Sequence, residues 1–411
     1  MWKLKWILTV LRARLEGTRR IPLSIGKFLV HFTPLRRILG APKGYRSVAL
    51  SGTRDRNGNC EIESIGPVET GEEISLPPAL FAIGNEVESK LLPCRFAANA
   101  RYVYLLRNGK YRNTSGHFEL AVLDANGQLL SELSPDAIGP DLHRIYGQFS
   151  IQKEQRIPGR AIVLTTPGAR RNYFHWCLEL LPKIHLLCSG GLFHPKNDIF
   201  LVNHDKAHYQ IQTLALLGLQ ASNVVRTYPG IKITADELIV PSHSSRHEAV
   251  PRWAIQFLRG RFLGRGSAAS DGKRLFLDRG AAKRRTILNQ AEVQKYLRGR
   301  GYTFVDSAGL SFQEQISLFR GARSIVSCHG AGLANLCFVE AGTTLLEIFS
   351  PYYMPDYFRV LSEHLGILYG CVSGVPSNGR AHVTERERIS EPFKLPLDRL
   401  AHAVEQLEHL S

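Results

Sequence analysis

From residue 161 onward, short apolar runs alternate with stretches whose apolar positions recur every three or four residues. The runs predict buried strands, and the stretches predict amphipathic helices. The predicted strands cover residues 161–165, 199–203, 237–241, 274–277, 302–305, 324–328 and 343–349. The predicted helices cover residues 173–188, 208–217, 253–262, 290–298, 312–319 and 397–410. This alternation is typical of an α/β fold built on parallel sheets.

A Gly- and Ser-rich break at residues 264–272 interrupts this alternation and predicts a domain boundary. A chain of 411 residues is also too long for one ordinary hydrophobic core. We therefore expect an N-terminal domain over residues 49–263 and a C-terminal domain over residues 273–411. The helix over residues 397–410 is expected to pack back across the boundary.

A small antiparallel β section is expected before the α/β alternation begins. Short β-type runs between residues 101 and 133 are separated by Asn108-Gly109 and Asn126-Gly127, which are strong hairpin signals. Residues 49–76 are polar and Gly-rich and predict no regular element.

The net charge of +16 is concentrated in a basic leader. Residues 1–48 hold eleven Lys or Arg and one acid, Glu16, and so carry +10 of this charge. Trp2 and Trp6 stand among the basic residues, in an apolar run too short for a membrane-spanning helix or a signal peptide. The pattern predicts an amphipathic leader that contacts an anionic membrane, although a solvated basic arm has the same composition. No nucleic-acid-binding signature accompanies it, so we expect no nucleic acid partner.

The seven cysteines form no Cys-x-x-Cys pair, which argues against a zinc site or a redox motif. Several lie within apolar stretches and are expected to be small buried hydrophobic residues. This usage indicates a reduced, cytoplasmic setting. A membrane-contacting leader would then lie at the inner face of the cell membrane.

A glycine-rich turn lies between the strands predicted over residues 324–328 and 343–349. His329, Gly330 and Gly332 form this turn, and its small residues let N–H groups at the start of the next helix approach an anion. Glu347 is a lone acid in the second strand. Because ligands of open α/β sheets bind at the carboxyl ends of strands, the turn suits a diphosphate and Glu347 suits a ribose. A simple tight turn and a capping or salt-bridged acid are the alternatives.

A second candidate site opens the helix predicted over residues 173–188. Asn172 stands at its N-cap, and His175 and Glu179 lie four residues apart on one helical face. A carboxylate at this spacing can fix the imidazole tautomer and raise its basicity, as a general base requires. A buried, hydrogen-bonded polar pair has the same spacing and is the alternative.

A basic cluster follows the strand predicted over residues 274–277. It contains Arg279, Lys283, Arg284 and Arg285. Guanidinium groups at the carboxyl end of a strand can clamp phosphates and stabilise a diphosphate leaving group. A solvated basic loop is the alternative.

Together these three clusters resemble glycosyltransferase family 61, a group that includes bacterial capsular-polysaccharide biosynthesis proteins. The matching pieces are NYFHWCLELLPKI, LFLDRGAAKRRTILNQAEV and FQEQISLFRGARSIVSCHGAGLANLCFVEAGTTLLEI, in the same order and spacing. One departure is Asp278, where the family usually has Ser. An acid beside a diphosphate is unfavourable unless it points away, which leaves the role of Arg279 open.

The resemblance implies a GT-B architecture, in which two Rossmann-like domains face a cleft. It also implies transfer of a sugar from a nucleotide donor with inversion at the anomeric carbon. The acceptor side falls in the N-terminal domain with His175 and Glu179, and the nucleotide sugar falls in the C-terminal domain. The implied donor-side residues are Arg279, Arg285, His329, Gly330, Gly332, Asn335 and Glu347.

The implied partners are a UDP-sugar and a glycan or lipid-linked glycan acceptor of a cell-surface or capsular polysaccharide. The chain contains no Asp-x-Asp pair that could bridge a divalent metal to substrate phosphates, so we expect no metal and no cofactor. Arg279, Arg285 and the N–H groups of the glycine turn would then stabilise the leaving diphosphate, while His175 deprotonates the acceptor hydroxyl.

Three other functions compete with this interpretation. His-Gly-Ala-Gly resembles the oxyanion loop of esterases, but the chain lacks their G-x-S-x-G nucleophile turn. A non-catalytic membrane- or polyanion-binding protein would use the basic leader and bind no nucleotide. A nucleotide-sugar enzyme of another kind, such as an epimerase of GT-B form, would transfer no sugar to an acceptor.

Overall fold

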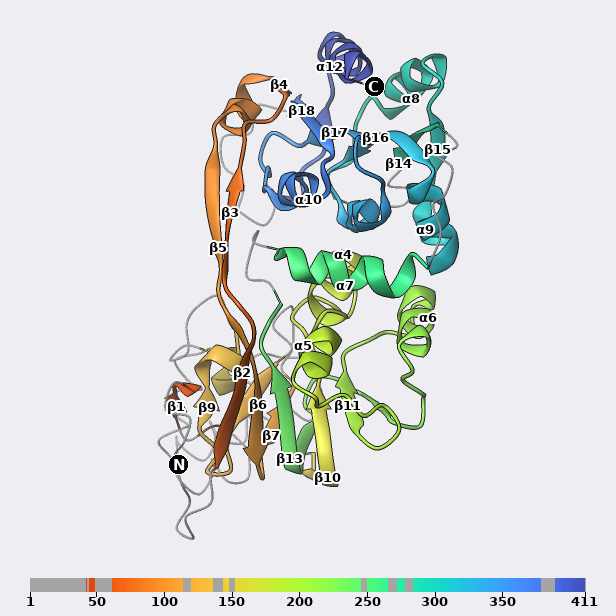
Figure 1. Cartoon of the computed structure of the whole chain (residues 1–411). Coiled ribbons are helices and arrows are strands. Elements are labelled where there is room, and N and C mark those ends of the chain that lie inside the picture. Colours follow the sequence, from red (N-terminus) through yellow and green to blue (C-terminus); the bar gives the residue numbers. More distant parts are fainter. Residues whose placement is uncertain are drawn as a thin grey trace.

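The computed structural model describes residues 42, 44–48, 61–113, 120–135, 143–147, 152–244, 250–264, 272–277, 284–377 and 389–410. Within them, the strands form a ten-stranded sheet, a six-stranded sheet and two short two-stranded pairs. Figure 1 shows the two large sheets in opposite halves of the molecule, with helix α7 (Arg252–Phe262) between them. Most of the predicted leader lies outside the described residues.

The ten-stranded sheet has a parallel part and an antiparallel part. Strands β13 (Lys232–Pro241), β10 (Gln155–Val163), β11 (Ile199–Val202) and β12 (Val224–Arg226) are successive parallel neighbours. The strands on the other side of β13 are β6 (Arg101–Arg107), β7 (Lys110–Arg112), β2 (Ile62–Glu69), β8 (Ala121–Leu123), β9 (Leu129–Leu130) and β1 (Tyr45–Arg46).

This arrangement confirms the antiparallel section but corrects the expectation of a parallel first sheet. β13 pairs antiparallel with both β6 and β7, so the antiparallel strands continue the same sheet instead of forming a separate layer. The sheet is therefore mixed, and β13 joins its parallel strands to its antiparallel strands.

The Asn108-Gly109 pair is not a hairpin turn, contrary to the prediction. β6 and β7 both pair with β13 and follow one another along it, and Asn108 between them has a φ of +52°. The N–H of Asn108 donates to the carbonyl of Asp236 at 2.8 Å, so the ladder continues past the break. Asn126-Gly127 does form the predicted turn, between β8 and β9, and Gly127 has a φ of +82°.

The six-stranded sheet is parallel throughout, in the order β15-β14-β16-β17-β18-β4. β14 (Lys273–Leu277), β15 (Thr303–Val305), β16 (Ala322–Cys328) and β17 (Thr344–Phe349) confirm predicted strands. β18 (Leu368–Ser373) is an addition that the sequence interpretation missed.

The edge strand β4 (Phe81–Ile83) comes from an early part of the chain. Figure 1 shows it at the end of a long ribbon formed by β3 (Glu72–Leu76) and β5 (Cys94–Ala98), which runs beside both halves. The predicted domain division stays a prediction. Strand β4 nevertheless comes from before residue 264 and forms the edge of the six-stranded sheet, whose other strands come from after that residue.

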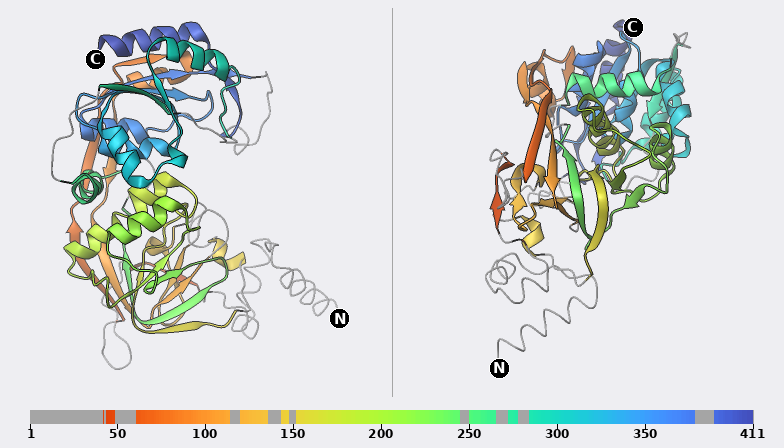
Figure 2. Two further views of the ribbon diagram at one scale, coloured as in Figure 1. Left: turned by 90° about the vertical axis from the view of Figure 1, so that its right-hand side faces the viewer. Right: turned by 60° about the horizontal axis from the view of Figure 1, so that its bottom comes forward.

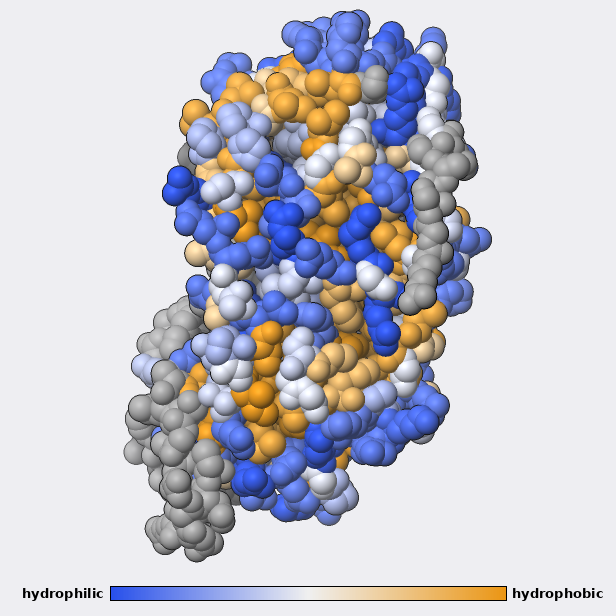
Figure 3. Space-filling view, viewed as in Figure 1, coloured by the Kyte–Doolittle hydropathy of each residue, from blue (hydrophilic) through white to orange (hydrophobic). Residues whose placement is uncertain are grey.

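The other described helices include α6 (His208–Leu216), α8 (Gln290–Gly299), α9 (Phe312–Arg320), α10 (Tyr357–Leu365) and α12 (Leu397–His409). Figure 2 shows α12 covering the six-stranded sheet at one end of the molecule, where it packs on β4, β17 and β18. No helix of the described residues is long and apolar enough to cross a membrane. Figure 3 shows hydrophilic and hydrophobic patches mixed over the viewed face.

A single cluster of buried apolar side chains extends across the contact between the two halves. Ile239 of the first sheet, Leu258 of α7 and Phe338 from the second half all belong to it. Arg259 of α7 donates to the carbonyl oxygens of Cys337 and Val339, at 2.8 and 2.7 Å. Residues from both halves can therefore contribute to one site.

Four cysteines, Cys177, Cys328, Cys337 and Cys371, are buried free thiols, as expected for small hydrophobic residues.

Candidate functional site

The predicted helix after Asn172 forms in three pieces. These are α4 (Tyr173–His175), a π-helical turn (Trp176–Leu180) and α5 (Lys183–Ser189). The Asn172 side chain accepts a hydrogen bond from the N–H of Phe174 at 2.9 Å, which confirms the predicted N-cap. Single π turns within α-helices are frequent at functional sites.

His175 and Glu179 form the pair that their spacing predicts. Nδ1 of His175 lies 2.9 Å from Oε2 of Glu179, and the His175 side chain is 33% exposed. A carboxylate accepts hydrogen bonds, so this contact holds a proton on Nδ1 and leaves Nε2 as the basic nitrogen. Within the described part of the chain, Nε2 makes no hydrogen bond. The geometry is that of an imidazole oriented for proton transfer.

The surroundings of His175 set its proton affinity. Burial opposes protonation, but the charge of Glu179 and its hydrogen bond outweigh burial and raise the pKa of His175 above its usual value. Lys183, further along the same helix, is fully buried and donates to the carbonyl of Thr165 at 2.8 Å. Burial lowers the pKa of Lys183 to about 7, against the opposing charge of Glu179. Glu179 therefore influences two bases of one helix.

The loop before α4 packs closely against the His175 ring. Gly168 has a φ of +78°, and a Cβ at this position would lie 2.7 Å from Cδ2 and 3.1 Å from Nε2 of His175. Only glycine suits both the backbone conformation and the close approach. The sequence interpretation missed this residue, although the Pro167-Gly168 dipeptide after a strand is a turn signal.

On the other half, β16 and β17 bring His329 and Glu347 together. Nδ1 of His329 lies 2.6 Å from Oε1 of Glu347, and the hydroxyl of Tyr369 donates to Oε2 at 2.7 Å. Glu347 is 0% exposed, and the His329 ring stacks on Phe349 with 5.6 Å between ring centroids. Both carboxylate oxygens thus have protein partners. The contact of Glu347 with a ribose stays a prediction.

The glycine turn leads into a 3₁₀ helix (Ala331–Phe338), which begins two residues before the position expected near Leu333. Gly330 is its N-cap, in an extended conformation with a φ of −176°. A helix leaves the N–H groups of its first turn without partners inside the helix. The placement suits an anion, and the roles of Gly330 and Gly332 in anion binding stay predictions.

Asn335 connects the two sequence motifs directly. The hydroxyl of Tyr173 donates to Oδ1 of Asn335 at 2.7 Å, and Nδ2 of Asn335 donates to Gln315 at 2.8 Å. Asn335 is fully buried. Its amide therefore joins the His175 helix to the helix after the glycine turn, and its predicted donor contact stays a prediction.

Aromatic rings link the two histidines across the halves. The Phe174 ring centroid lies 5.6 Å from that of His175 and 5.8 Å from that of Phe358. The Phe358 ring in turn lies 5.1 Å from His329. Tyr357 contacts both Phe174 and His329. The structure thus gathers the predicted acceptor-side and donor-side residues around one aromatic cluster.

Arg285 joins this group through Tyr353. Its guanidinium carbon lies 4.9 Å from the centre of the Tyr353 ring, which meets the His329 ring edge-on at 5.3 Å. Arg279 and the neighbouring Asp278 lie outside the described residues. Among the residues that are described, no group of three or more His, Cys, Asp or Glu is arranged to hold a metal ion. Metal independence stays a prediction.

Residues 173–346 match the protein-family model described as Glycosyltransferase 61. The matched segment contains His175, Glu179, Arg285 and His329, and it ends one residue before Glu347. The comparison with curated proteins finds no match.

This family-model match, together with the mixed α/β fold, supports a glycosyltransferase. Over residues 173–346 the chain is similar to glycosyltransferase family 61, which confirms the resemblance recognised in the sequence.

Proposed function

We propose that the protein transfers a sugar from a nucleotide-sugar donor to a hydroxyl of a glycan acceptor, with inversion at the anomeric carbon and without a metal ion. The His175–Glu179 pair carries this proposal, because it presents a basic nitrogen at a partly exposed position. The Tyr173–Asn335 hydrogen bond supports it further by fixing the helix of His175 against the helix after the glycine turn. A UDP-sugar donor, a GT-B cleft between the halves and a role in capsular or other cell-surface polysaccharide synthesis belong to the same proposal.

His175 is the general base of the proposed reaction. Its Nε2 takes the proton of the acceptor hydroxyl, and the acceptor oxygen forms a bond to the anomeric carbon as the bond from that carbon to the diphosphate breaks. Glu179 stabilises the imidazolium that results, in agreement with its effect on the pKa of His175. A single displacement of this kind inverts the configuration of the carbon.

The donor side stabilises the departing nucleoside diphosphate. Negative charge develops on the diphosphate oxygens as the bond breaks. Arg285 and the first-turn N–H groups of the Ala331–Phe338 helix are the described groups that would interact with this charge. Arg279 would add a second guanidinium.

Glu347 has a positioning role in this proposal. A fully buried carboxylate that accepts from Tyr369 and contacts Nδ1 of His329 is better suited to orienting the imidazole than to binding a ribose. His329 then presents a fixed ring face beside the glycine turn.

The basic leader extends the proposal to the location of the enzyme. Its +10 charge and its tryptophans would hold the enzyme at the anionic inner face of the cell membrane, within reach of a lipid-linked acceptor.

Calorimetric titration with UDP, GDP and CMP, with and without magnesium, tests the donor side. We expect one nucleotide to bind without metal and its affinity to fall about tenfold in Arg285→Gln, since one charge-assisted contact is lost. Arg298→Gln is the matched control, because Arg298 also stacks on an aromatic ring, Phe304, at 4.6 Å. Failure of all three nucleotides to bind would overturn the proposal and favour the membrane- or polyanion-binding alternative.

A further inference from the structure

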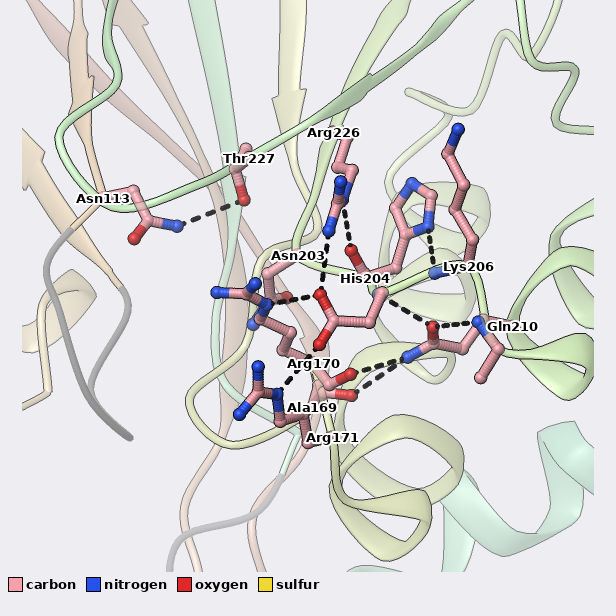
Figure 4. A network of polar contacts seen from close by, with 12 residues as sticks. Asn113, Ala169, Arg170, Arg171, Asn203, His204, Lys206, Gln210, Arg226 and Thr227 are labelled. Carbon is pink, nitrogen blue, oxygen red and sulfur yellow. Dashed lines mark hydrogen bonds and ion pairs between the residues drawn. The ribbon is translucent and has the colours of Figure 1, made fainter. Parts of the chain in front are cut away.

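A charged cluster lies where the loops after β10 and β11 meet the last residue of β12. Arg170, Arg171 and Arg226 all donate to the carboxylate of Asp205, at 2.7, 2.9 and 2.9 Å. Figure 4 shows the consecutive residues Arg170 and Arg171 converging with Arg226 from another segment, with His204 and Lys206 beside them. We call Arg170, Arg171, Asp205, Lys206 and Arg226 the Asp205 cluster.

The Asp205 cluster has a surplus of positive charge. Three guanidinium groups and the exposed ammonium of Lys206 surround a single carboxylate. Burial opposes ionisation of Asp205, but hydrogen bonds from the three arginines outweigh it and hold its pKa well below the usual range. Burial lowers the pKa of His204, and the charges of Arg226 and Lys206 lower it further. The carboxylate is thus ionised, His204 is neutral near pH 7, and the cluster carries about three net positive charges.

A buried amide side chain holds the backbone of this cluster in place. The side chain of Gln210 is fully buried and accepts from the N–H groups of Asp205 and Ala207, at 3.0 Å each. The same side chain donates to the carbonyl oxygens of Ala169 and Arg170. The two loops are therefore fixed against each other, and a ligand would meet guanidinium groups that are already positioned.

The Asp205 cluster adjoins the candidate acceptor side. Arg170 and Arg171 belong to the loop in which Gly168 packs on the His175 ring. Tyr209, at the start of α6, packs edge-on against Tyr173 with 4.9 Å between ring centroids. The cluster also stands at the carboxyl ends of three parallel strands, which is where open α/β sheets bind ligands.

We propose that the Asp205 cluster binds an anionic group of the acceptor, either a phosphate or the carboxylate of an acidic sugar. The inference rests on the proposed function, because it assigns the site to the acceptor of the transfer reaction. A guanidinium group matches both anions with paired N–H donors, so the shared chemistry is an oxyanion with two or more acceptor oxygens.

Binding of small probes to the nucleotide-saturated, full-length protein tests this site. The probes are glucose 6-phosphate, glucuronate and neutral glucose, and saturation with nucleotide keeps them out of the donor site. We expect one or both anionic probes to bind more tightly than glucose and to lose about tenfold in affinity in Arg171→Gln. Arg95→Gln is the matched control. The Arg95 side chain is 76% exposed and pairs with Glu73, whereas that of Arg171 is 79% exposed and pairs with Asp205.

Asp205→Asn separates ligand binding from a purely structural role. Asp205→Asn removes the only carboxylate of the Asp205 cluster and so makes the cluster more positive. We therefore expect Asp205→Asn to raise the affinity for the anionic probe, whereas Arg171→Gln should lower it. The preferred probe identifies the anion as phosphate or carboxylate. Equal, weak binding of all three probes, with Asp205→Asn changing only thermal stability, would overturn the inference. If the protein still binds a nucleotide when all three probes bind equally and weakly, the proposed function stands and only the inference about the Asp205 cluster fails.

Discussion

The two halves of the molecule each contain a histidine paired with a glutamate, and the two pairs have opposite environments. His175 is 33% exposed and makes its contact with Glu179 along one helix. His329 directly follows β16 and Glu347 lies on the neighbouring parallel strand β17, and both side chains are almost fully buried. The hydroxyl of Tyr369 donates to the second carboxylate oxygen of Glu347. The same two residue types thus form one accessible pair and one enclosed pair.

This difference shows that the role of a His–Glu pair depends on the exposure of its imidazole, which the two residue types alone do not reveal. An accessible imidazole with its proton fixed on Nδ1 can exchange a proton with a substrate at Nε2. An imidazole enclosed by Phe349, Tyr353, Tyr357 and Phe358 is instead held in one orientation. We therefore expect loss of the first pair to affect mainly catalysis, and loss of the second pair to affect stability and donor binding together.

The largest expected effect is on catalysis, in His175→Ala. Removal of the proposed general base should lower kcat for sugar transfer about a thousandfold, since proton transfer by a positioned base contributes roughly 10²–10⁴. Nucleotide affinity and thermal stability should change little, because the ring is partly exposed and lies on the proposed acceptor side. Steady-state kinetics, nucleotide calorimetry and thermal unfolding measure the three quantities.

His185→Ala is the control for that variant. His185 lies on α5, is 28% exposed and contacts Glu69 through Nε2 at 2.5 Å, so it repeats the chemistry of the pair away from the site. A similar loss of kcat in both variants, or a large loss of nucleotide affinity in His175→Ala, would contradict the role of His175 as base.

The next effect is on stability, in Glu347→Gln. An amide offers one acceptor oxygen where the carboxylate offers two, so Tyr369 or His329 loses a buried acceptor. The expected cost is about 2 kcal/mol in the free energy of unfolding, with weaker nucleotide binding as the His329 ring loosens. Glu179→Gln should cost less than about 1 kcal/mol, because its partner is partly exposed. Urea unfolding compares the two, and equal costs would remove the distinction between the pairs.

The sequence predicted the local features of both pairs but not their environments. Helical spacing predicted the contact of His175 with Glu179, and the Asn172 cap followed from residue type. The alternation of apolar runs located β16 and β17, since buried parallel strands read as continuous hydrophobic segments.

Long-range contacts could not be predicted from spacing, residue type and apolar runs. The Tyr369 hydroxyl on Glu347 and the Tyr173–Asn335 bond join segments whose separation in the sequence carries no periodic signal. The Asn108-Gly109 error has the same origin, because pairing of both flanking strands with β13 overrides the local preference for a hairpin. The ribbon that carries β4 into the second sheet lay partly in the stretch without periodicity.

A smaller catalytic effect is expected from Gly168→Ala, which tests whether the position of the His175 ring in the His175–Glu179 pair matters for the reaction. The new Cβ would meet the His175 ring at 2.7 Å and displace it, so transfer should fall about tenfold. Gly127→Ala is the control, since Gly127 has a similar positive φ of +82° and open space around it. Both variants should lose about 1 kcal/mol of stability to backbone strain. Only Gly168→Ala should slow the reaction, and equal activities would show that the contact with the ring is not critical.

The smallest expected effect is a shift in the pH dependence of transfer. A general base works in its neutral form, so activity should be lost as the pH falls through the raised pKa of His175. Glu179→Gln removes the charge that raises this pKa and leaves burial unopposed, so the acidic limb of the kcat profile should move to lower pH. Lys183, with a pKa of about 7, would respond to Glu179→Gln in the same direction. Lys183→Met therefore serves to decide which of the two bases causes the acidic limb. A limb that persists in this variant belongs to His175, and one that disappears assigns the proton transfer to the buried lysine instead.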